Sequence, residues 1–130
     1  MQLIGEINWA LILGPLGYFI IVGGLLDGLF VFLFLRLRKY LVAIGEALVA
    51  NIFSLLAGFY SWPYIFPNGF DFEDLSFISY GLLWLVTVIT EAIVLKLFNR
   101  SKAWKFIFLA SVIMNLVSFA VLYLYFWMIN

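Results

Sequence analysis

Two residue types are missing from this 130-residue chain, cysteine and histidine, and charged residues make up only 11% of it. The absence of both excludes disulfides, thiolate and imidazole metal sites, and Ser-His or Cys-His nucleophile pairs. Roughly a quarter of the residues in a soluble domain are charged. Here 67% are hydrophobic, with a mean hydropathy of +1.17. The composition therefore predicts an integral membrane protein with lipid around most of its surface.

Long apolar stretches indicate how often the chain crosses the membrane. A helix needs about 20 apolar residues to cross roughly 30 Å of hydrocarbon. Four stretches qualify, so we expect one all-α transmembrane domain over residues 1–130, with helices at about 8–35, 41–60, 76–98 and 106–127. Pro15 removes a helical hydrogen bond and is expected to kink the outer end of the first helix. The first stretch is too long, and its start lacks the basic residues, for a cleavable signal peptide.

The basic residues indicate the orientation of the chain. Two short loops, at 36–39 and 99–105, are basic, and their bases are Arg36, Arg38, Lys39, Arg100, Lys102 and Lys105. The seventh base, Lys96, lies just before the second loop. Short loops rich in Lys and Arg stay in the cytoplasm. We therefore expect a multi-pass protein of a prokaryotic cytoplasmic membrane, with both termini on the non-cytoplasmic side. Topology accounts for these bases, so no nucleic-acid partner is expected.

Polar residues recur at an offset of 64 positions. Asp27 aligns with Glu91, Arg36 with Arg100, Asn51 with Asn115 and Ser54 with Ser118, without a gap. Polar matches carry this signal because polar residues are scarce in the chain. The pattern predicts two parallel repeats, at about 22–60 and 86–124. Each would be a helical hairpin, and the two would be related by a pseudo-two-fold axis along the membrane normal.

Three acids lie within the expected helices, at Asp27, Glu46 and Glu91. All three belong to the half of the membrane next to the basic loops, with Asp27 deepest at ~12–14 Å from its loop. A charge at the bilayer centre costs about 2.5–3.5 kcal/mol on insertion scales, so such acids suggest a function. Two interpretations stay open. The acids pair with Arg and Lys side chains that fold back from the loops, or they handle an ion or a ligand.

Small and polar residues form stripes at helical spacing on each expected helix. Gly24 and Gly28 lie four residues apart beside Asp27. The stripe on the second helix consists of Ala47, Asn51, Ser54 and Gly58. The stripe on the fourth helix consists of Ser111, Asn115 and Ser118. Small residues let helices approach closely, and Asn or Ser can form hydrogen bonds across the contact. We expect these stripes to pack the helices together, and the alternative is that they line a polar pathway.

An acid, a basic loop and then an Asn-x-x-Ser motif followed by a glycine and an aromatic residue, as in "ANIFSLLAGFY", form a pattern. This pattern resembles that of the cyanobacterial filament-integrity family FraC. The resemblance covers one hairpin of about 38 residues at a time. It rests on Asp27 or Glu91, Arg36 or Arg100, Asn51 or Asn115, Ser54 or Ser118, and Gly58. Only the first hairpin has the glycine. The resemblance implies a small polytopic protein with a structural, junction-forming role.

These observations favour a non-enzymatic protein that packs as a subunit of a larger membrane complex or oligomer. The expected partners are lipids and other membrane subunits or further copies of the chain. No cofactor is predicted, although a bound lipid or pigment is compatible with the composition. The alternative function is a small proton- or cation-coupled transporter that uses the intramembrane carboxylates. An enzyme is not expected, because too few polar groups converge.

Overall fold

The computed structural model describes residue 14 and residues 16–67 and 77–129, which are almost entirely helical. The elements are a π-helical segment η1 (Phe19–Leu26), α2 (Asp27–Leu35), α3 (Tyr40–Ile65), α4 (Phe77–Phe98) and α5 (Trp104–Ile129). Segment η1 continues directly into α2. Four helices are long and apolar enough to cross a membrane, beginning with the span Leu16–Leu35. The predicted all-α fold with four transmembrane helices is confirmed.

The helix bounds differ from the expected ones at a few ends. Helix α3 continues past residue 60 and ends at Ile65. Pro63 lies in its last turn, so the one backbone hydrogen bond that the proline removes is close to the end of the helix. Helix α5 begins two residues earlier than expected, at Trp104. Pro15 and residues 8–13 lie outside the described residues. The irregularity in the first span is instead the wider π-helix of η1.

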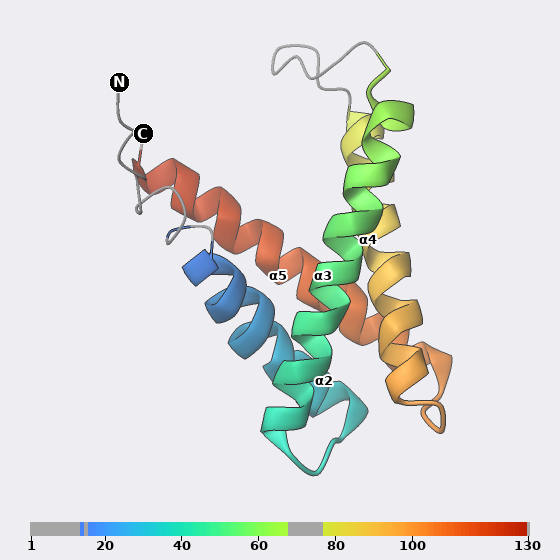
Figure 1. Ribbon diagram of the computed structural model, residues 1–130. Helices are drawn as coiled ribbons and strands as arrows, with labels where there is room; N and C mark the ends of the chain where they lie inside the picture. Colours follow the sequence, from blue (N-terminus) through green and yellow to red (C-terminus); the bar gives the residue numbers. More distant parts are fainter. Residues whose placement is uncertain (1–13, 15, 68–76, 130) are drawn as a thin grey trace, which may run out of the picture.

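The four spans form a ring in which each contacts its neighbours in the chain, and α2 closes the ring against α5. Both basic loops lie at the same end of the bundle, at the bottom of Figure 1. Toward the opposite end, the pair of α3 and α4 diverges from the pair of η1 and α5 (Figure 1). The helices therefore pack most closely in the half that contains the loops and the three acids.

Glycine lets α2 approach α3 in this half. A Cβ on Gly28 would lie 2.9 Å from the Ile44 Cα, and one on Gly24 would lie 3.1 Å from a Leu48 methyl carbon. Gly58 has more room, since its nearest neighbour would be a Leu83 methyl carbon at 3.7 Å. The contact at Gly28 is with backbone, which cannot move aside as a side chain can. Gly28 therefore sets the distance between the two helices.

Burial follows the 64-residue offset found in the sequence. Residues at equivalent positions are buried together in both halves of the chain, at Asp27 and Glu91, Val31 and Leu95, Ala43 and Ile107, Ala47 and Ser111, and Ala50 and Met114. Most of them belong to one apolar core around the middle of the ring. The two halves thus present equivalent faces to the interior.

Candidate functional site

Seven polar side chains from all four spans form the polar core of the bundle, namely Asp27, Asn51, Ser54, Glu91, Ser111, Asn115 and Ser118. Asp27 is the first residue of α2, and only 2% of it is exposed. The Asn51 amide nitrogen donates to its Oδ2 at 3.1 Å, and the Ser118 hydroxyl donates to its Oδ1 at 3.0 Å. Asp27 thus joins α2 to both α3 and α5.

The Asn51 amide is fixed by more than the carboxylate. Its nitrogen also lies 3.0 Å from the carbonyl oxygens of Gly23 and Ala47. Ala47 precedes Asn51 by one turn of α3, whereas Gly23 belongs to η1. Three acceptors share two amide hydrogens, so the side chain is held in one orientation. The lack of a side chain at Gly23 lets the Asn51 amide approach, since a Cβ there would lie 3.3 Å from the Asn51 nitrogen.

Glu91 has an equivalent environment in the second half of the chain and is also 2% exposed. The Asn115 amide donates to its Oε2 and to the Ser111 carbonyl oxygen, the latter at 2.9 Å. The Ser111 hydroxyl lies 3.4 Å from the same carboxylate and donates to the Val88 carbonyl oxygen at 2.8 Å. The acid and the Asn are 24 residues apart in both halves.

The serines of the two Asn-x-x-Ser motifs contact the opposite half of the chain. Ser118 of α5 donates to Asp27 of α2, and Ser54 of α3 lies near the Glu91 carboxylate of α4. The Ser54 hydroxyl donates to the Asn51 carbonyl oxygen at 3.0 Å. Each carboxylate therefore binds the Asn of its own hairpin and has the Ser of the other hairpin beside it. This exchange ties the two hairpins together.

Glu46 lies apart from the polar core, nearer the basic loops. The Asn99 amide donates to its Oε2 at 2.6 Å and to the Leu95 carbonyl oxygen at 3.0 Å. Asn99 follows α4 directly, so this bond joins the start of α3 to the end of α4. The positions equivalent by the 64-residue offset hold Leu35 and Ala110, both buried and apolar. The Glu46–Asn99 bond thus exists on one side of the bundle only.

The pairing of the acids with loop bases, one of the two interpretations left open by the sequence, is not observed among the described residues. In the described part of the chain, which includes all seven bases, the side-chain partners of the three acids are amides and hydroxyls. Lys96 instead donates to the carbonyl oxygens of Arg100 and Lys102, at 2.8 and 2.5 Å. The predicted loop bases are exposed, except that Lys102 is partly buried. A helical rise of several turns separates these bases from Asp27.

Three contributors to these contacts were not predicted as site residues. Asn99 belongs to the basic loop by sequence, and its local pattern does not indicate that it faces Glu46, 53 residues earlier in the chain. The Thr87 hydroxyl lies 2.7 Å from the Trp84 carbonyl oxygen and 3.2 Å from the Asn115 Oδ1. The Tyr18 hydroxyl donates to the Ser118 carbonyl oxygen at 2.8 Å, which joins the first span to α5.

The polar core can donate and accept hydrogen bonds, and its carboxylates can bind a proton or a small cation. Among the described residues, no three acidic, Cys or His side chains are grouped in a way that could hold a metal ion. The two carboxylates lie close enough to interact electrostatically. Their donors are neutral, so a negative charge on either one would have no cationic partner from the described residues.

The acid, Asn and Ser positions behind the resemblance to the FraC family all lie in the polar core, whereas Gly58 contacts α4 outside it. That resemblance remains a prediction. In comparisons with known proteins, no family model, curated protein or solved structure matches this chain.

Proposed function

We propose that this chain is a non-enzymatic membrane protein that serves as a structural subunit of a larger membrane assembly or oligomer. The proposal rests on the hydrogen bonds that the buried polar side chains form between helices. Asp27 and Glu91 each accept hydrogen bonds from other helices, so these groups hold the bundle in one shape. The two hollows described on the surface are lined mainly by apolar side chains, which favours lipid or protein contacts over catalysis.

The shape of the bundle at the end opposite the basic loops also supports a role in assembly. There the two helix pairs diverge (Figure 1), and large apolar and aromatic side chains such as Leu55, Phe59 and Tyr60 are exposed. The small residues that were expected to pack the helices together are buried inside the bundle. A partner helix would therefore contact the large apolar residues, most readily near the diverging ends.

An internal duplication and a fixed topology are parts of the same proposal. The 64-residue correspondence of burial and of the Asp27–Asn51 and Glu91–Asn115 bonds supports two repeated hairpins. The shared location of the two basic loops supports placing both in the cytoplasm, with the protein in a prokaryotic cytoplasmic membrane. Partners would be lipids and other membrane subunits or further copies of this chain.

The second candidate function is proton- or cation-coupled transport. One specific observation favours it, namely that the buried carboxylates have neutral donors and no basic partner in the described part of the chain. An acid without a counter-charge inside a membrane is often part of an ion or proton pathway. The two functions predict different effects when a carboxylate is removed: a structural role predicts lower stability, and a transport role predicts a loss of proton flux.

The test replaces each acid by its amide, as Asp27→Asn and Glu91→Gln. An amide nitrogen would face Asn or Ser donors, so a structural role predicts a loss of about 1–3 kcal/mol in stability for each variant. It also predicts a smaller assembled mass by light scattering in mild detergent. Thr90→Val serves as the control, because the Thr90 hydroxyl bonds only to its own helix, at the Val86 carbonyl oxygen.

Wild-type protein in vesicles with an entrapped pH-sensitive dye measures the competing function. A structural role predicts no protein-dependent proton flux under an imposed membrane potential. Proton flux in the wild type, abolished in an Asp27→Asn variant that keeps its fold and assembled mass, would overturn the proposal and establish transport.

A further inference from the structure

An apolar groove of about 490 Å³ runs along the outside of the bundle between α3 and α4. Its walls include Val49 and Phe53 from α3, and Thr90, Val94, Leu97 and Phe98 from α4. Thr90 adds little polarity, because its hydroxyl donates to the Val86 carbonyl oxygen at 2.8 Å. Gly45 lies one turn before Val49 and is exposed, with open space where a side chain would be. The groove is therefore open toward the basic loops.

The groove lies in one leaflet of the membrane. Phe98 ends α4 next to a basic loop, and Thr90 lies eight residues earlier, which is about 12 Å along the helix. Half of the hydrocarbon thickness is about 15 Å. The groove thus extends from the interface on the loop side to near the middle of the bilayer. Its length and apolar walls match one acyl chain of a lipid in that leaflet.

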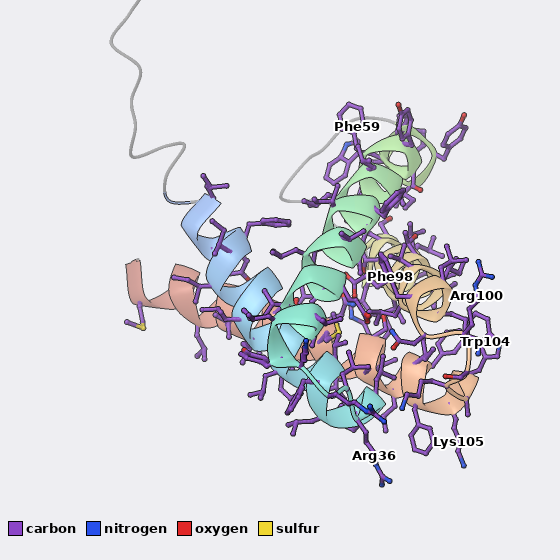
Figure 2. The ribbon with its side chains drawn as sticks, turned by 60° about the horizontal axis from the view of Figure 1, so that its bottom comes forward. Arg36, Phe59, Phe98, Arg100, Trp104 and Lys105 are labelled. Atoms are coloured by element: carbon purple, nitrogen blue, oxygen red, sulfur yellow. The ribbon has the colours of Figure 1, made fainter. Side chains whose placement is uncertain are left out.

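A cation follows the last groove residue of α4 closely in the chain. Arg100 follows Phe98 by two residues and is exposed, and its side chain has no hydrogen-bond or ionic partner among the described residues. Lys96 is occupied, because its ammonium donates to two backbone carbonyls. Trp104 is 48% exposed at the same loop. Figure 2 shows Phe98 on the side of α4 toward α3, and Arg100 and Trp104 farther from α3, beside the second basic loop.

Two positions of the first span that are equivalent to the groove carry larger side chains than α4 does. Leu26 corresponds to Thr90, and Phe30 corresponds to Val94 at the 64-residue offset. The Phe30 ring packs against Phe34 with 6.4 Å between ring centroids. Thr90 and Val94 thus leave more room on α4 than their equivalents leave on the first span. Arg36, which is equivalent to Arg100, has the same charge, lies away from Phe98 at the other basic loop (Figure 2), and provides a matched control.

We propose that the groove between α3 and α4 binds one acyl chain of an anionic phospholipid from the leaflet on the side of the basic loops, with the lipid phosphate on Arg100. A guanidinium binds phosphate with two parallel hydrogen bonds, and an exposed tryptophan is suited to the headgroup region. The Arg100 charge complements the phosphate. This site goes beyond the structural role above and depends only on the protein spanning a membrane.

The experiment measures lipid retained by the full chain in native mass spectrometry. The protein is purified in mild detergent with equal amounts of phosphatidylglycerol and phosphatidylcholine that carry identical acyl chains. We expect one phosphatidylglycerol per chain, retained about fivefold over phosphatidylcholine, which is the effect of one base near a membrane surface. Arg100→Gln should abolish this preference, and Arg36→Gln should leave it unchanged.

A second pair of variants tests the groove itself. Thr90→Phe fills the groove and should reduce retention of both lipids, whereas Ile89→Phe, on the neighbouring exposed position of the same helix, should not. Thr90→Leu is the milder substitute if thermal unfolding shows that Thr90→Phe perturbs the fold.

Equal retention of the two lipids, equal losses in Arg36→Gln and Arg100→Gln, or unchanged retention in the groove-filling variant would each overturn the proposal. A second protein chain that holds the groove in place of lipid, and is released by Thr90→Phe, would overturn it as well.

Discussion

Gly28 leaves no space for a methyl group between α2 and α3, because a Cβ there would lie 2.9 Å from the Ile44 Cα. We predict that Gly28→Ala destabilises the bundle by about 1–3 kcal/mol, the usual cost of overpacking a well-packed contact. The reason is that the clash is with backbone, so α2 must move away from α3. The shift would also lengthen the hydrogen bond between Asn51 and Asp27. Thermal unfolding in detergent measures the loss.

Gly45→Ala is the control for this substitution. Gly45 is in α3, is exposed and has nothing within 4 Å of the place that an alanine methyl group would occupy. Alanine favours helix over glycine by about 0.8–1.0 kcal/mol in water, so this variant should unfold at the same or a higher temperature. Equal destabilisation by both alanines would mean that the close approach at Gly28 does not limit the packing.

At the scale of the helices, the two Asn residues connect each return helix to the helix before it. We predict that Asn51→Leu and Asn115→Leu each lower stability by about 0.5–2 kcal/mol, the range for hydrogen bonds between membrane helices. Leucine inserts readily into a membrane, so the loss reflects the missing bond and the bulkier side chain. Each substitution also removes one hydrogen-bond donor from a buried carboxylate, Asp27 in the first variant and Glu91 in the second.

The measurement for these variants is again thermal unfolding, combined with the oligomeric mass in mild detergent. Thr90→Val removes a hydroxyl that bonds only within α4 and should change neither quantity. Wild-type values for both Asn variants would show that the two amides do not hold the helices together.

Much of the helix arrangement could be predicted from the sequence. Apolar stretches of about 20 residues fix the number and the approximate bounds of the spans, since length and hydrophobicity alone decide whether a helix can cross the membrane. The spacing of Gly24 and Gly28 also indicated a close contact, which lies against α3. The equal separation of acid and Asn in both halves, 24 residues, was available to predict the bonds of Asp27 and Glu91.

Other features depend on how the helices are placed in space. The contact of Ser118 with Asp27 requires the ring to close between α2 and α5, which no local pattern indicates. The pairing of the acids with loop bases, one of the two open interpretations, is not observed among the described residues, where amides and hydroxyls are the donors. The π-helical register of η1 could not be predicted either, because it depends on which carbonyl each amide bonds to.

For the whole molecule, the predicted orientation has both basic loops in the cytoplasm. The native chain has no cysteine, so single cysteines introduced at Ser101 and Pro67 can be labelled without background. Both positions are exposed, at opposite ends of the bundle. We predict that an impermeant thiol reagent added to intact cells labels the cysteine at 67 and not the one at 101.

Inverted membrane vesicles should give the opposite labelling pattern. A cysteine at Leu109, within α5 and facing outward, should react in neither preparation, because lipid excludes the reagent. Labelling of positions 67 and 101 from the same side would contradict the four-span topology, and exchange of the two patterns would reverse the orientation.

The π-helical segment η1 affects how the chain tolerates a change in length. A π-helix contains more residues per turn than an α-helix, so the loss of one residue at 19–21 can be absorbed by a return to α-helical bonds. Residues before the deletion would then keep the faces that they present now, so Leu16 would still face outward. The same loss within α2 would rotate Asp27 away from Asn51. Insertions and deletions should therefore accumulate before Val22 and be excluded between Asp27 and Leu35.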